Sequence, residues 1–569
     1  MKKATFSGLL VVLVLSVLSG CAKATTGTGS AEGFKGPVEV SVTVKDGKVT
    51  GATLTTMDDT QEIGGVAASQ VIQQAVSTGK VEGLDVVSGA TITSEAVIKA
   101  LQSAYATAMG QAPTEVAAVA QDTSCDIVVI GAGGAGLSAA TEAAGKGKSV
   151  IVLEKMGIVG GNTNYATGGL NASETSVQAG LGIADTNEAY IADTMKGGGN
   201  INDEELVRTM VEKSAETVDW LIEIGADLTD VGKMAGSSNN RTHRPQGGAA
   251  VGAHLSKVLD NAARAAGADI RLNSTVTSIL NEGGKAVGVV VSGPNGNYSI
   301  SAKAVIVATG GFGANPELVE SLNTNLAGFG TTNHAGATGD AFDLVKPFDA
   351  AVVDMAQIQT HPTVVPVKNL MITEAVRGNG AIMVNREGKR FGSEMATRDV
   401  MSAAVLDQTG DTAYLLFDQG IRESLKAIEG YAKQGLLTEG ATVAELAEKL
   451  SIPADVLEAT VNTYNEYQAA GNDAEFGRKG SEMPRPIATG PFYAVEVGPA
   501  IHHTMGGLKI NTNAEVLNNA GAVIPGLYAA GEVTGGIHGN NRLGGNAVAD
   551  ITVFGKIAGA NAATYVDAN

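Results

Sequence analysis

The chain has 569 residues, a formal net charge of −20, 75 glycines and only 4% aromatic residues. This length predicts more than one domain, and frequent glycine is typical of an α/β enzyme with many tight turns. The negative charge argues against nucleic acid as a partner, because phosphates would be repelled. The two cysteines, Cys21 and Cys125, form neither a CxxCH nor a CxxC motif. The sequence therefore predicts no attached c-type haem and no metal site.

Residues 1–21 have the pattern of a secretory signal. Lys2 and Lys3 precede an apolar run that is short for a transmembrane helix, and Leu-Ser-Gly-Cys ends at Cys21. These four residues resemble a bacterial lipobox, which implies lipidation of Cys21; a plain signal peptide with a chance cysteine is the alternative. Residues 22–34 are small and polar, so we expect a flexible tether. The protein is thus expected to be extracytoplasmic and lipid-anchored to the cell membrane.

Residues 35–109 predict a small α+β domain. Valines alternate with mostly polar residues over 38–44, and a turn leads to a returning strand over 49–56. A helix is expected over 66–77 and a second one up to about residue 109. The small polar segment 110–123 reads as an interdomain linker.

A glycine-rich turn, Ser88-Gly-Ala-Thr-Ile-Thr-Ser94, precedes the second of these helices. Such a turn can hold a phosphate on backbone N–H groups, or it can be an ordinary turn with Ser94 as the N-cap. The pattern DxxSGATxTS resembles the attachment motif of FMN-binding domains, in which a flavin transferase links the FMN phosphate to a threonine. That resemblance implies covalent FMN on Thr91, with Thr93 as the alternative.

The segment that begins at Asp126 carries a dinucleotide-binding fingerprint. A buried strand over 126–130 leads into the GxGxxG motif, a small-residue helix follows over 137–144, and a second strand over 149–153 ends at an acid. Glycines at these positions let pyrophosphate approach the helix N-terminus, and the acid binds a ribose hydroxyl. The candidate residues are Gly131, Gly133, Ala135, Gly136 and Glu154.

Later segments favour FAD over NAD. A second glycine-rich segment supplies Asn162, Thr163, Gly168 and Gly169, and further strands are expected over 304–308 and from residue 526. Strands that return to one sheet in this way resemble the FAD-binding fold of succinate dehydrogenase and fumarate reductase flavoproteins. The resemblance implies non-covalent FAD and adds contacts from Val276, Asp340, His503, Glu532, Ala547 and Val548. His243 and His334 are interpreted as structural.

Residues 371–399 gather charged groups between apolar and glycine-rich residues: Thr373, Glu374, Arg377, Arg390 and Arg398. A solvated basic loop would tolerate these cations, whereas a buried pocket would need anions opposite them. The stretch alone does not decide between the two interpretations.

From about residue 124 to the end, the chain resembles the soluble fumarate reductases of the flavocytochrome c type. The resemblance rests on the motifs HPT, MITEAVRGNGAI, NREGKRF, TRD, HHTMGG, GLYAAGEVTGG and NRLGGNA. It implies that His361 and Thr373 hold one carboxylate of fumarate while His502 and Arg542 hold the other. Cations and donors at both ends would clamp the substrate and polarise its double bond.

The same resemblance implies that Arg398 protonates the substrate, with Glu374 and Arg377 as its relay to solvent, while Met371 packs over the flavin. Arginine is a poor acid in water, so its neighbours must assist proton transfer. Members of this family carry a multihaem domain where this chain has the FMN-type domain. We therefore expect electrons to pass from a quinol- or dehydrogenase-linked donor through FMN to FAD.

The expected fold is an α/β FAD-binding Rossmann-like core in two parts, residues 124–351 and 500–569, with an α+β capping domain over 352–499 that closes over the site. The main competing functions are reduction of urocanate, acrylate or methacrylate, and a flavin-based electron-transfer lipoprotein. Substrates with a single carboxylate would not need both His361 and Thr373, so fumarate is favoured.

Overall fold

The computed structural model describes residues 24–32, 37–57, 64–85, 87, 91–110 and 122–569. They belong to two compact units, divided between Val119 and Ala120. The predicted signal with Cys21 and most of the predicted linker lie outside the described residues. No helix among the described residues is both long and apolar enough to cross a membrane.

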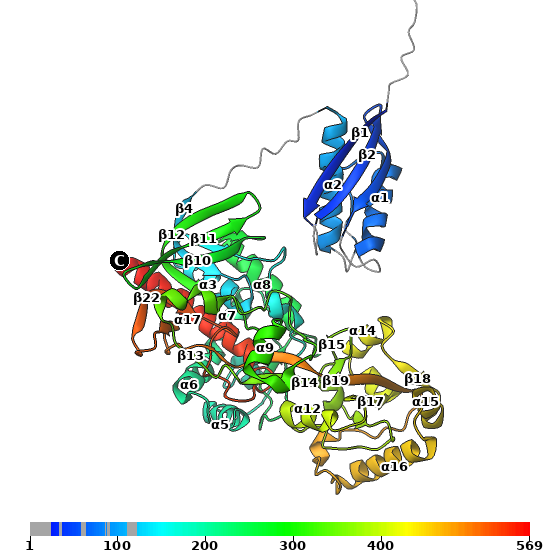
Figure 1. Ribbon diagram of the computed structural model, residues 1–569. Coiled ribbons are helices and arrows are strands. Elements are labelled where there is room, and N and C mark those ends of the chain that lie inside the picture. The colour runs from blue at the N-terminus through cyan, green and yellow to red at the C-terminus, as the bar shows by residue number, and fades with distance from the viewer. Residues whose placement is uncertain (1–23, 33–36, 58–63, 86, 88–90, 111–121) are drawn as a thin grey trace, which may run out of the picture. The chain divides into compact units, whose positions relative to one another are not determined.

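The first unit is a three-stranded antiparallel sheet, in the order β1-β2-β3, with two helices packed on it (Figure 1). Its elements are β1 (Thr25–Glu32), β2 (Pro37–Lys45), β3 (Lys48–Thr56), α1 (Val66–Thr78) and α2 (Thr91–Ala108). The alternating valines of β2 are all buried, so the period-two pattern correctly marked the face of the sheet that contacts the helices. The two predicted strands and two predicted helices are confirmed.

The prediction of a flexible tether over 22–34 is wrong for residues 25–32. They form β1, which pairs with β2 along its whole length, from Thr25 opposite Val44 to Glu32 opposite Pro37. Gly27 and Gly29 make this possible, because a Cβ atom there would lie 2.2 Å from the carbonyl oxygen of Ala104 and 2.3 Å from that of Ala100. The small residues allow helix α2 to pack closely on the strand.

Helix α2 begins at Thr91, three residues before the suggested N-cap, so Ser94 lies inside the helix. The hydroxyl of Ser94 accepts a hydrogen bond from the backbone N–H of Val87 at 3.1 Å. The side chain of Thr91 lies outside the described residues, and its predicted role as an FMN attachment site stays a prediction.

The second unit is built around an eight-stranded sheet in which β10-β11-β12-β4-β5-β9 are neighbours and β22 pairs with both β12 and β21. Strands β5, β4, β12 and β22 run parallel to one another in that order. They correspond to the four strands that the sequence predicted to share one sheet. The strands are β4 (Thr123–Ile130), β5 (Val150–Leu153), β9 (Asp269–Arg271), β10 (Thr275–Glu282), β11 (Lys285–Gly293), β12 (Gly296–Val307), β21 (Glu515–Leu517) and β22 (Val523–Ala529).

Helices α3 (Gly134–Gly145), α8 (Gly252–Ala265) and α17 (Asn546–Ala568) pack near the parallel strands, with α3 between the other two. They contribute apolar side chains to one continuous core with the sheet. A smaller sheet, β6-β8-β7, and further helices complete this part. Their bounds are β6 (Leu170–Asn171), β7 (Asp230–Gly232), β8 (Thr242–Arg244), α4 (Ser176–Gly180), α5 (Asn187–Gly197), α6 (Glu204–Glu212), α7 (Ser214–Glu223), α9 (Pro316–Leu322) and α10 (Ala341–Leu344).

The region predicted as a capping domain has a sheet and a hydrophobic core of its own. Its elements are β13 (Val352–Val353), β14 (Ile358–Val365), β15 (Leu370–Met371), α11 (Ala375–Gly378), β16 (Ile382–Val384), α12 (Arg398–Leu406), β17 (Ala413–Asp418), α13 (Gln419–Ser424), α14 (Ala427–Lys433), β18 (Thr438–Gly440), α15 (Val443–Leu450) and α16 (Ala454–Ala470). Strand β19 (Phe492–Thr504) completes the sheet of the cap, whereas β20 (Gly507–Leu508) pairs with β13 in a separate two-stranded sheet.

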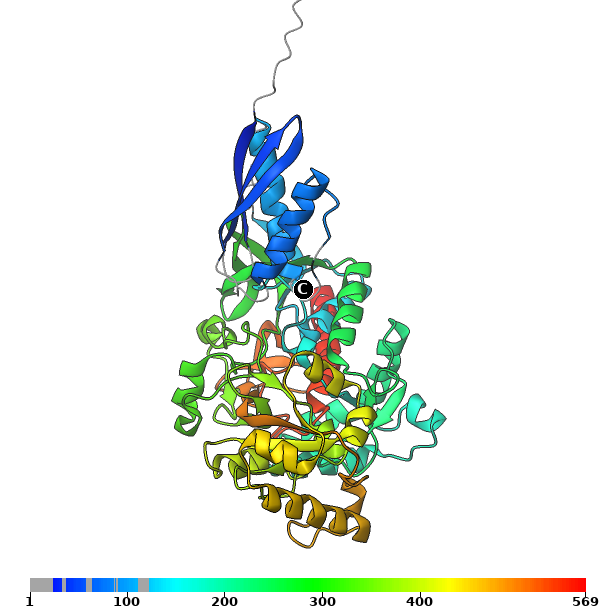
Figure 2. The same cartoon turned by 90° about the vertical axis from the view of Figure 1, so that its right-hand side faces the viewer.

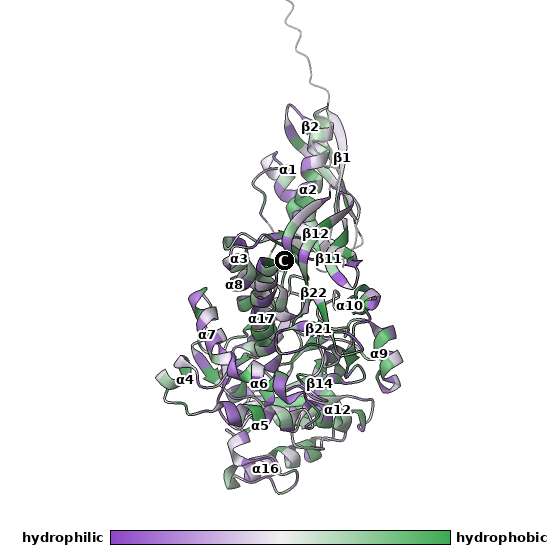
Figure 3. Cartoon of the chain, turned by 90° about the vertical axis from the view of Figure 1, so that its left-hand side faces the viewer, coloured by the Kyte–Doolittle hydropathy of each residue, from purple (hydrophilic) through white to green (hydrophobic). Residues whose placement is uncertain are grey.

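Strand β19 crosses the predicted boundary at residue 499, because it pairs with β14, β17 and β18 and continues without a break to Thr504. The core and the cap are thus joined by one continuous strand. Within this unit, α16 lies at the edge far from β10, β11 and β12 (Figures 1 and 2). Hydrophobic and hydrophilic residues alternate along the ribbon of α16 (Figure 3), as expected of a helix that buries only one face.

Candidate active site

Two clefts in the second unit share part of their walls. The space inside them, counted out to open solvent, is about 840 and about 890 Å³. Asn162, Thr163, Glu532 and Ile551 line both. A long ligand that enters the first cleft therefore reaches the wall of the second.

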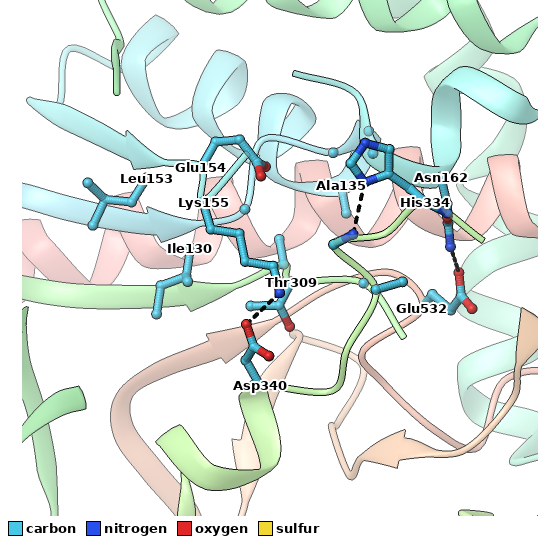
Figure 4. Close-up of a pocket in the computed structure, with 18 of the residues that line it drawn as sticks. Ile130, Ala135, Leu153, Glu154, Lys155, Asn162, Thr309, His334, Asp340 and Glu532 are labelled. Carbon is cyan, nitrogen blue, oxygen red and sulfur yellow. Dashed lines mark hydrogen bonds and ion pairs between the residues drawn. The ribbon is translucent and has the colours of Figure 1, made fainter. Parts of the chain in front are cut away.

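The first cleft follows the predicted dinucleotide fingerprint (Figure 4). Nine of the predicted cofactor residues line it: Gly131, Gly133, Ala135, Glu154, Asn162, Thr163, Val276, Asp340 and Glu532. Gly136 does not, because it serves packing: a Cβ atom there would lie 1.9 Å from the carbonyl oxygen of Gly131. Gly134 and Ala135 at the N-terminus of α3 line this cleft, and the dipole at a helix N-terminus favours an anion such as pyrophosphate.

Glu154 follows β5 and lines the first cleft. Its Oε2 accepts the backbone N–H of Ala132 at 2.9 Å and its Oε1 accepts that of Met156 at 2.8 Å. Burial raises the pKa of this carboxyl, and the two backbone N–H groups oppose that rise. These bonds orient the carboxylate and leave lone pairs for a ribose hydroxyl.

Other polar groups are fixed around the same cleft. Lys155 donates to Asp340 at 2.7 Å, and Asn162 donates to Glu532 at 3.2 Å (Figure 4). The hydroxyl of Thr309 is buried without a hydrogen-bond partner, and it lines the cleft. An unsatisfied hydroxyl beside a glycine-lined cradle fits a bound dinucleotide, which would supply the partner.

The two histidines that sequence reasoning treated as structural differ in their placement. His243 is buried and contacts Thr175 Oγ1 at 2.8 Å through Nε2 and the carbonyl of Arg241 at 3.0 Å through Nδ1, which agrees with a structural role. His334 instead lines the first cleft (Figure 4). Its interpretation as merely structural missed this position.

The second cleft brings together the remaining candidates from distant parts of the chain. Its lining includes the predicted cofactor residues Gly168, Gly169, His503, Ala547 and Val548 and the predicted substrate or catalytic residues His361, Thr373, Glu374, Arg398, His502 and Arg542. Met371 also lines it. These residues lie just before β6, in or next to β14, β15, α12 and β19, and around the start of α17. Both the core and the cap therefore contribute to the cleft.

In the predicted substrate clamp, His361, Thr373 and Arg542 are buried and His502 is half-buried. The rings of His361 and His502 meet edge to face, with centroids 5.1 Å apart, and His361 Nε2 has no hydrogen-bond partner. Burial and the nearby arginines lower the pKa of both rings well below the usual value. Arg542 is 6% exposed and forms no ion pair with a described carboxylate; burial, then the charge of Arg398, lowers its pKa to about 9.

His503, unlike the neighbouring His502, lies beside a carboxylate. Its Nδ1 lies 3.5 Å from Glu532 Oε1, and its Nε2 is unpartnered. Burial lowers the pKa of His503 to about 4, while His503 and hydrogen-bond donors outweigh burial and lower that of Glu532 to about 2. Near neutral pH the pair is a neutral imidazole beside a carboxylate.

The predicted proton relay is connected at its inner end. Arg398 begins α12, and its Nε donates to Glu374 Oε2 at 3.1 Å. Arg377 Nη2 lies 3.7 Å from the same oxygen. Burial alone would raise the pKa of Glu374, but Arg398 and Arg377 outweigh it and lower the pKa.

The prediction that the relay reaches solvent at Arg377 is wrong. Arg377 is 1% exposed and does not line the cleft; it lies on the short helix α11, three residues after Glu374. Burial lowers the pKa of Arg377, and the positive charges of Arg398 and Arg478 lower it further, against the effect of Glu374.

Two residues that sequence reasoning missed hold the predicted ones in place. Gln359 accepts from Arg398 Nη1 at 3.1 Å and donates to the carbonyl of Arg542 at 2.9 Å, so it joins the cap to the core. Tyr431 accepts the backbone N–H of Thr373 at 3.0 Å. Gln359 lies two residues before His361 in β14, a period-two spacing that could have found it; Tyr431 has no such local signal.

A cleft for a dinucleotide, joined to a cleft that contains a buried arginine with no ion pair among the described residues, defines a flavin-dependent oxidoreductase. The family model described as FAD binding domain matches residues 126–548, and the one described as FMN-binding domain matches residues 33–106. FAD and FMN are the cofactors of these two domains.

Similarity to known proteins identifies the family of this chain. A fumarate reductase (cytochrome) of Shewanella frigidimarina is 48% identical over 79% of this chain and 79% of its own length. A solved flavocytochrome c3 fumarate reductase in an open conformation has a TM-score of 0.68 and 43% identity, over 78% of this chain and 79% of that one. A urocanate reductase of Eggerthella lenta is 34% identical over 94% of this chain and 92% of its own length. The chain belongs to the fumarate reductase family of FAD-dependent flavoproteins.

Proposed function

We propose that this protein reduces fumarate to succinate. The proposal depends mainly on Arg542, a buried cation that lines the second cleft and has no ion pair among the described residues. A buried charge without a counterion is destabilising, so the cleft is suited to a ligand that supplies one. His361, with its unpartnered Nε2, provides a further donor for an anionic ligand. Two carboxylates on a short, flat substrate match this set of groups.

The imidazoles of His361 and His502 can gain protons as the dianion binds. Both have a lowered pKa in the ligand-free cleft, and a carboxylate beside each would favour the charged form. Thr373 adds a hydroxyl at one end of the cleft, held through its backbone by Tyr431. Together these groups would orient fumarate and stabilise negative charge as it develops on a carboxylate.

The reaction adds a hydride and a proton across the double bond. FAD, held by the residues that line the first cleft, would in its reduced form supply the hydride for one alkene carbon. Arg398 donates the proton to the other carbon, and Glu374, bonded to Arg398 Nε at 3.1 Å, returns a proton to it. Arg377 is the next member of the relay, and its Nη2 lies 3.7 Å from Glu374 Oε2. Met371, in the lining of the cleft, helps to exclude water.

The electron path and location form part of the same proposal. Thr91 would hold FMN through a phosphoester that a flavin transferase forms, and this FMN would provide the route for electrons from a quinol- or dehydrogenase-linked donor to FAD. Cys21 carries a lipid that holds the protein at the outer face of the cell membrane. The FMN-binding domain match over residues 33–106 supports the first part, and the sequence before residue 22 supports the second.

Dye-linked reduction of fumarate, urocanate and methacrylate by the purified, FAD-loaded protein tests the proposal. Fumarate turnover that is lost in Arg398→Ala, with FAD still bound, is the expected result. Turnover of fumarate that survives in Arg398→Ala would remove Arg398 as the acid. Thr91→Ala should keep the dye-linked activity and lose reduction by a physiological donor; loss of both in a folded, FAD-loaded protein would contradict the role given to FMN.

Reduction of another unsaturated carboxylate is the second candidate. It is favoured by the relative named urocanate reductase, whose similarity extends over 94% of this chain. A protein that reduces urocanate or methacrylate but not fumarate would support the proposed hydride transfer. It would contradict the proposal that His361 and Thr373 bind a carboxylate of fumarate. A protein that reduces none of them but exchanges electrons with the dye would be an electron carrier.

A further inference from the structure

A buried ionic cluster lies behind the relay and is not used by the proposed reaction. Glu394 Oε2 is 2.8 Å from Arg390 Nη2 and 3.1 Å from Arg478 Nη1, and Arg390 Nη2 is also 2.8 Å from Asp473. The side chains of these four residues are at most 2% exposed. Arg390 belongs to the charged stretch that the sequence singled out, but its role there was left open.

Arg478 connects this cluster to the relay. Its Nη2 donates to the backbone carbonyl of Arg377 at 2.6 Å, and its Nη1 also donates to that of Ala381 at 3.1 Å. Its Nε donates to the carbonyl of Glu482 at 3.1 Å. All three nitrogens of Arg478 are therefore engaged, and the guanidinium is fixed relative to α11.

The side chain of Arg377 is held from the same direction. Its Nη1 donates to the backbone carbonyl of Glu394 at 2.6 Å, whereas its Nε and Nη2 have no hydrogen-bond partner. Its Nη2 approaches Glu374 only to 3.7 Å. One nitrogen is thus anchored in the cluster, and the two free ones remain for exchange with Glu374.

The charges around Arg377 do not balance. Four arginines share three carboxylates in this part of the cap: Arg377, Arg390, Arg398 and Arg478 with Glu374, Glu394 and Asp473. The charged and titratable groups that act on Arg377 or feel its charge are Glu374 in its own segment, Arg398 on α12, Glu394 after β16, Arg478 after α16 and His361 on β14. Excess positive charge in a buried site favours release of a proton.

We propose that Arg478 is a positioning residue for proton delivery: it fixes the backbone of Arg377 and places a positive charge beside that guanidinium. Arg377 then transfers a proton to Glu374 more readily than a lone buried arginine would, and it regains that proton from solvent water before the next turnover. This inference rests on the proposed relay and extends it beyond the residues that line the cleft.

A purely structural role for Arg478 is the alternative, and the chain offers a matched control. Arg241 is also fully buried, and it pairs with Asp185 at 3.0 Å and Asp193 at 3.0 Å away from the relay. Arg241→Lys should therefore destabilise the fold without altering proton delivery. Arg478→Lys keeps the charge but loses the fork of hydrogen bonds, and Arg478→Met loses both.

The experiment measures kcat and KM for dye-linked fumarate reduction and the solvent deuterium isotope effect on kcat, per FAD-loaded protein. We expect Arg478→Met to lower kcat by about tenfold, the effect of one pKa unit on a proton donor, with a larger isotope effect and an unchanged KM. Arg478→Lys should lie between this variant and the wild type, and it also serves if Arg478→Met does not fold. Arg241→Lys should keep the wild-type kcat and isotope effect.

Wild-type kcat and isotope effect in both Arg478 variants would overturn the inference, as would an equal loss in Arg241→Lys. Failure of the proposed function gives a different pattern. In that case the wild-type protein would not reduce fumarate, or Arg398→Ala would remain active.

Discussion

Replacement of Arg542 by methionine tests whether the second cleft is built to receive an anion. Arg542 is buried, it has no ion pair among the described residues, and burial lowers its pKa to about 9. The ordinary pKa of arginine is at least ~12.5 and one pKa unit corresponds to about 1.4 kcal/mol, so the unpaired charge of Arg542 destabilises the fold by on the order of 5 kcal/mol. Methionine removes this charge and keeps an unbranched apolar chain.

We expect the Arg542→Met variant to melt at a higher temperature than the wild type when no ligand is present. The hydrogen bond from Arg542 Nη1 to the carbonyl of Leu543, at 3.3 Å, is lost as well, which offsets about 1 kcal/mol of the gain. Succinate should stabilise the wild type, by about 2.7 kcal/mol at a hundred times its Kd. It should leave the variant unchanged, because the anion has lost its main countercharge.

The pH dependence follows from the same pKa. Since the pKa of Arg542 is lower in the folded protein than in the unfolded chain, the unfolded chain holds more protons above about pH 9. The destabilisation is therefore fully present below about pH 9 and fades as the pH rises further. The difference in stability between wild type and variant should shrink over that range.

Thermal melting of the FAD-loaded proteins, with and without succinate, measures these effects. Arg208→Met is the control, because the side chain of Arg208 is 39% exposed and forms only surface ion pairs, which contribute little. An Arg542→Met protein that melts below the wild type and still gains stability from succinate would refute the reasoning, because neither the unpaired charge nor the anion site would then exist.

Three further predictions address the rest of the cleft. Glu374→Gln should lower kcat by at least ~100-fold with little change in KM, because the amide cannot carry the proton to Arg398; unchanged dye-linked turnover would contradict the relay. Succinate should bind more tightly at pH 6 than at pH 8, since His361 and His502 are neutral in the ligand-free cleft and gain protons beside a carboxylate; calorimetric titration at both pH values checks the sign, and equal affinity would argue against it. Tyr431→Phe should raise KM for fumarate and lower the free energy of unfolding by about 1–3 kcal/mol, because it leaves the backbone N–H of Thr373 without a partner; steady-state kinetics and melting test this, and a wild-type KM would show that the bond does not position Thr373.

Most of the fold was predictable because its signals are local. The strand before GxGxxG, the helix after it and the acid at the end of the next strand all lie within residues 126–154, and the structure confirms them. The error over residues 22–34 has the opposite cause. Small polar residues read as a linker, and only the close approach of α2 to Gly27 and Gly29 gives them a place in a sheet. That contact spans most of the domain and leaves no local pattern.

The residues of the site were predicted better than their surroundings. The residues given by motif resemblance, such as His361 and Arg542, meet in one cleft, although their roles stay predictions. The sequence could not show that Arg377 is buried, because its exposure depends on the cap residues Glu394 and Arg478 packed behind it. Charge patterning within residues 371–399 identified the cations but not which anion each one meets.

The arrangement of anions explains how a chain with net charge −20 can hold a negatively charged substrate. The buried carboxylate of Glu374 forms ion pairs with Arg398 and Arg377, and the carboxylate of Glu532 lies beside His503. Arg542 is left without such a partner among the described residues, and its charge acts at short range because the side chain is buried. The distant surface charge is screened by salt over about 10 Å. Binding is therefore decided by a cation that the fold leaves unpaired, and not by the sign of the whole molecule.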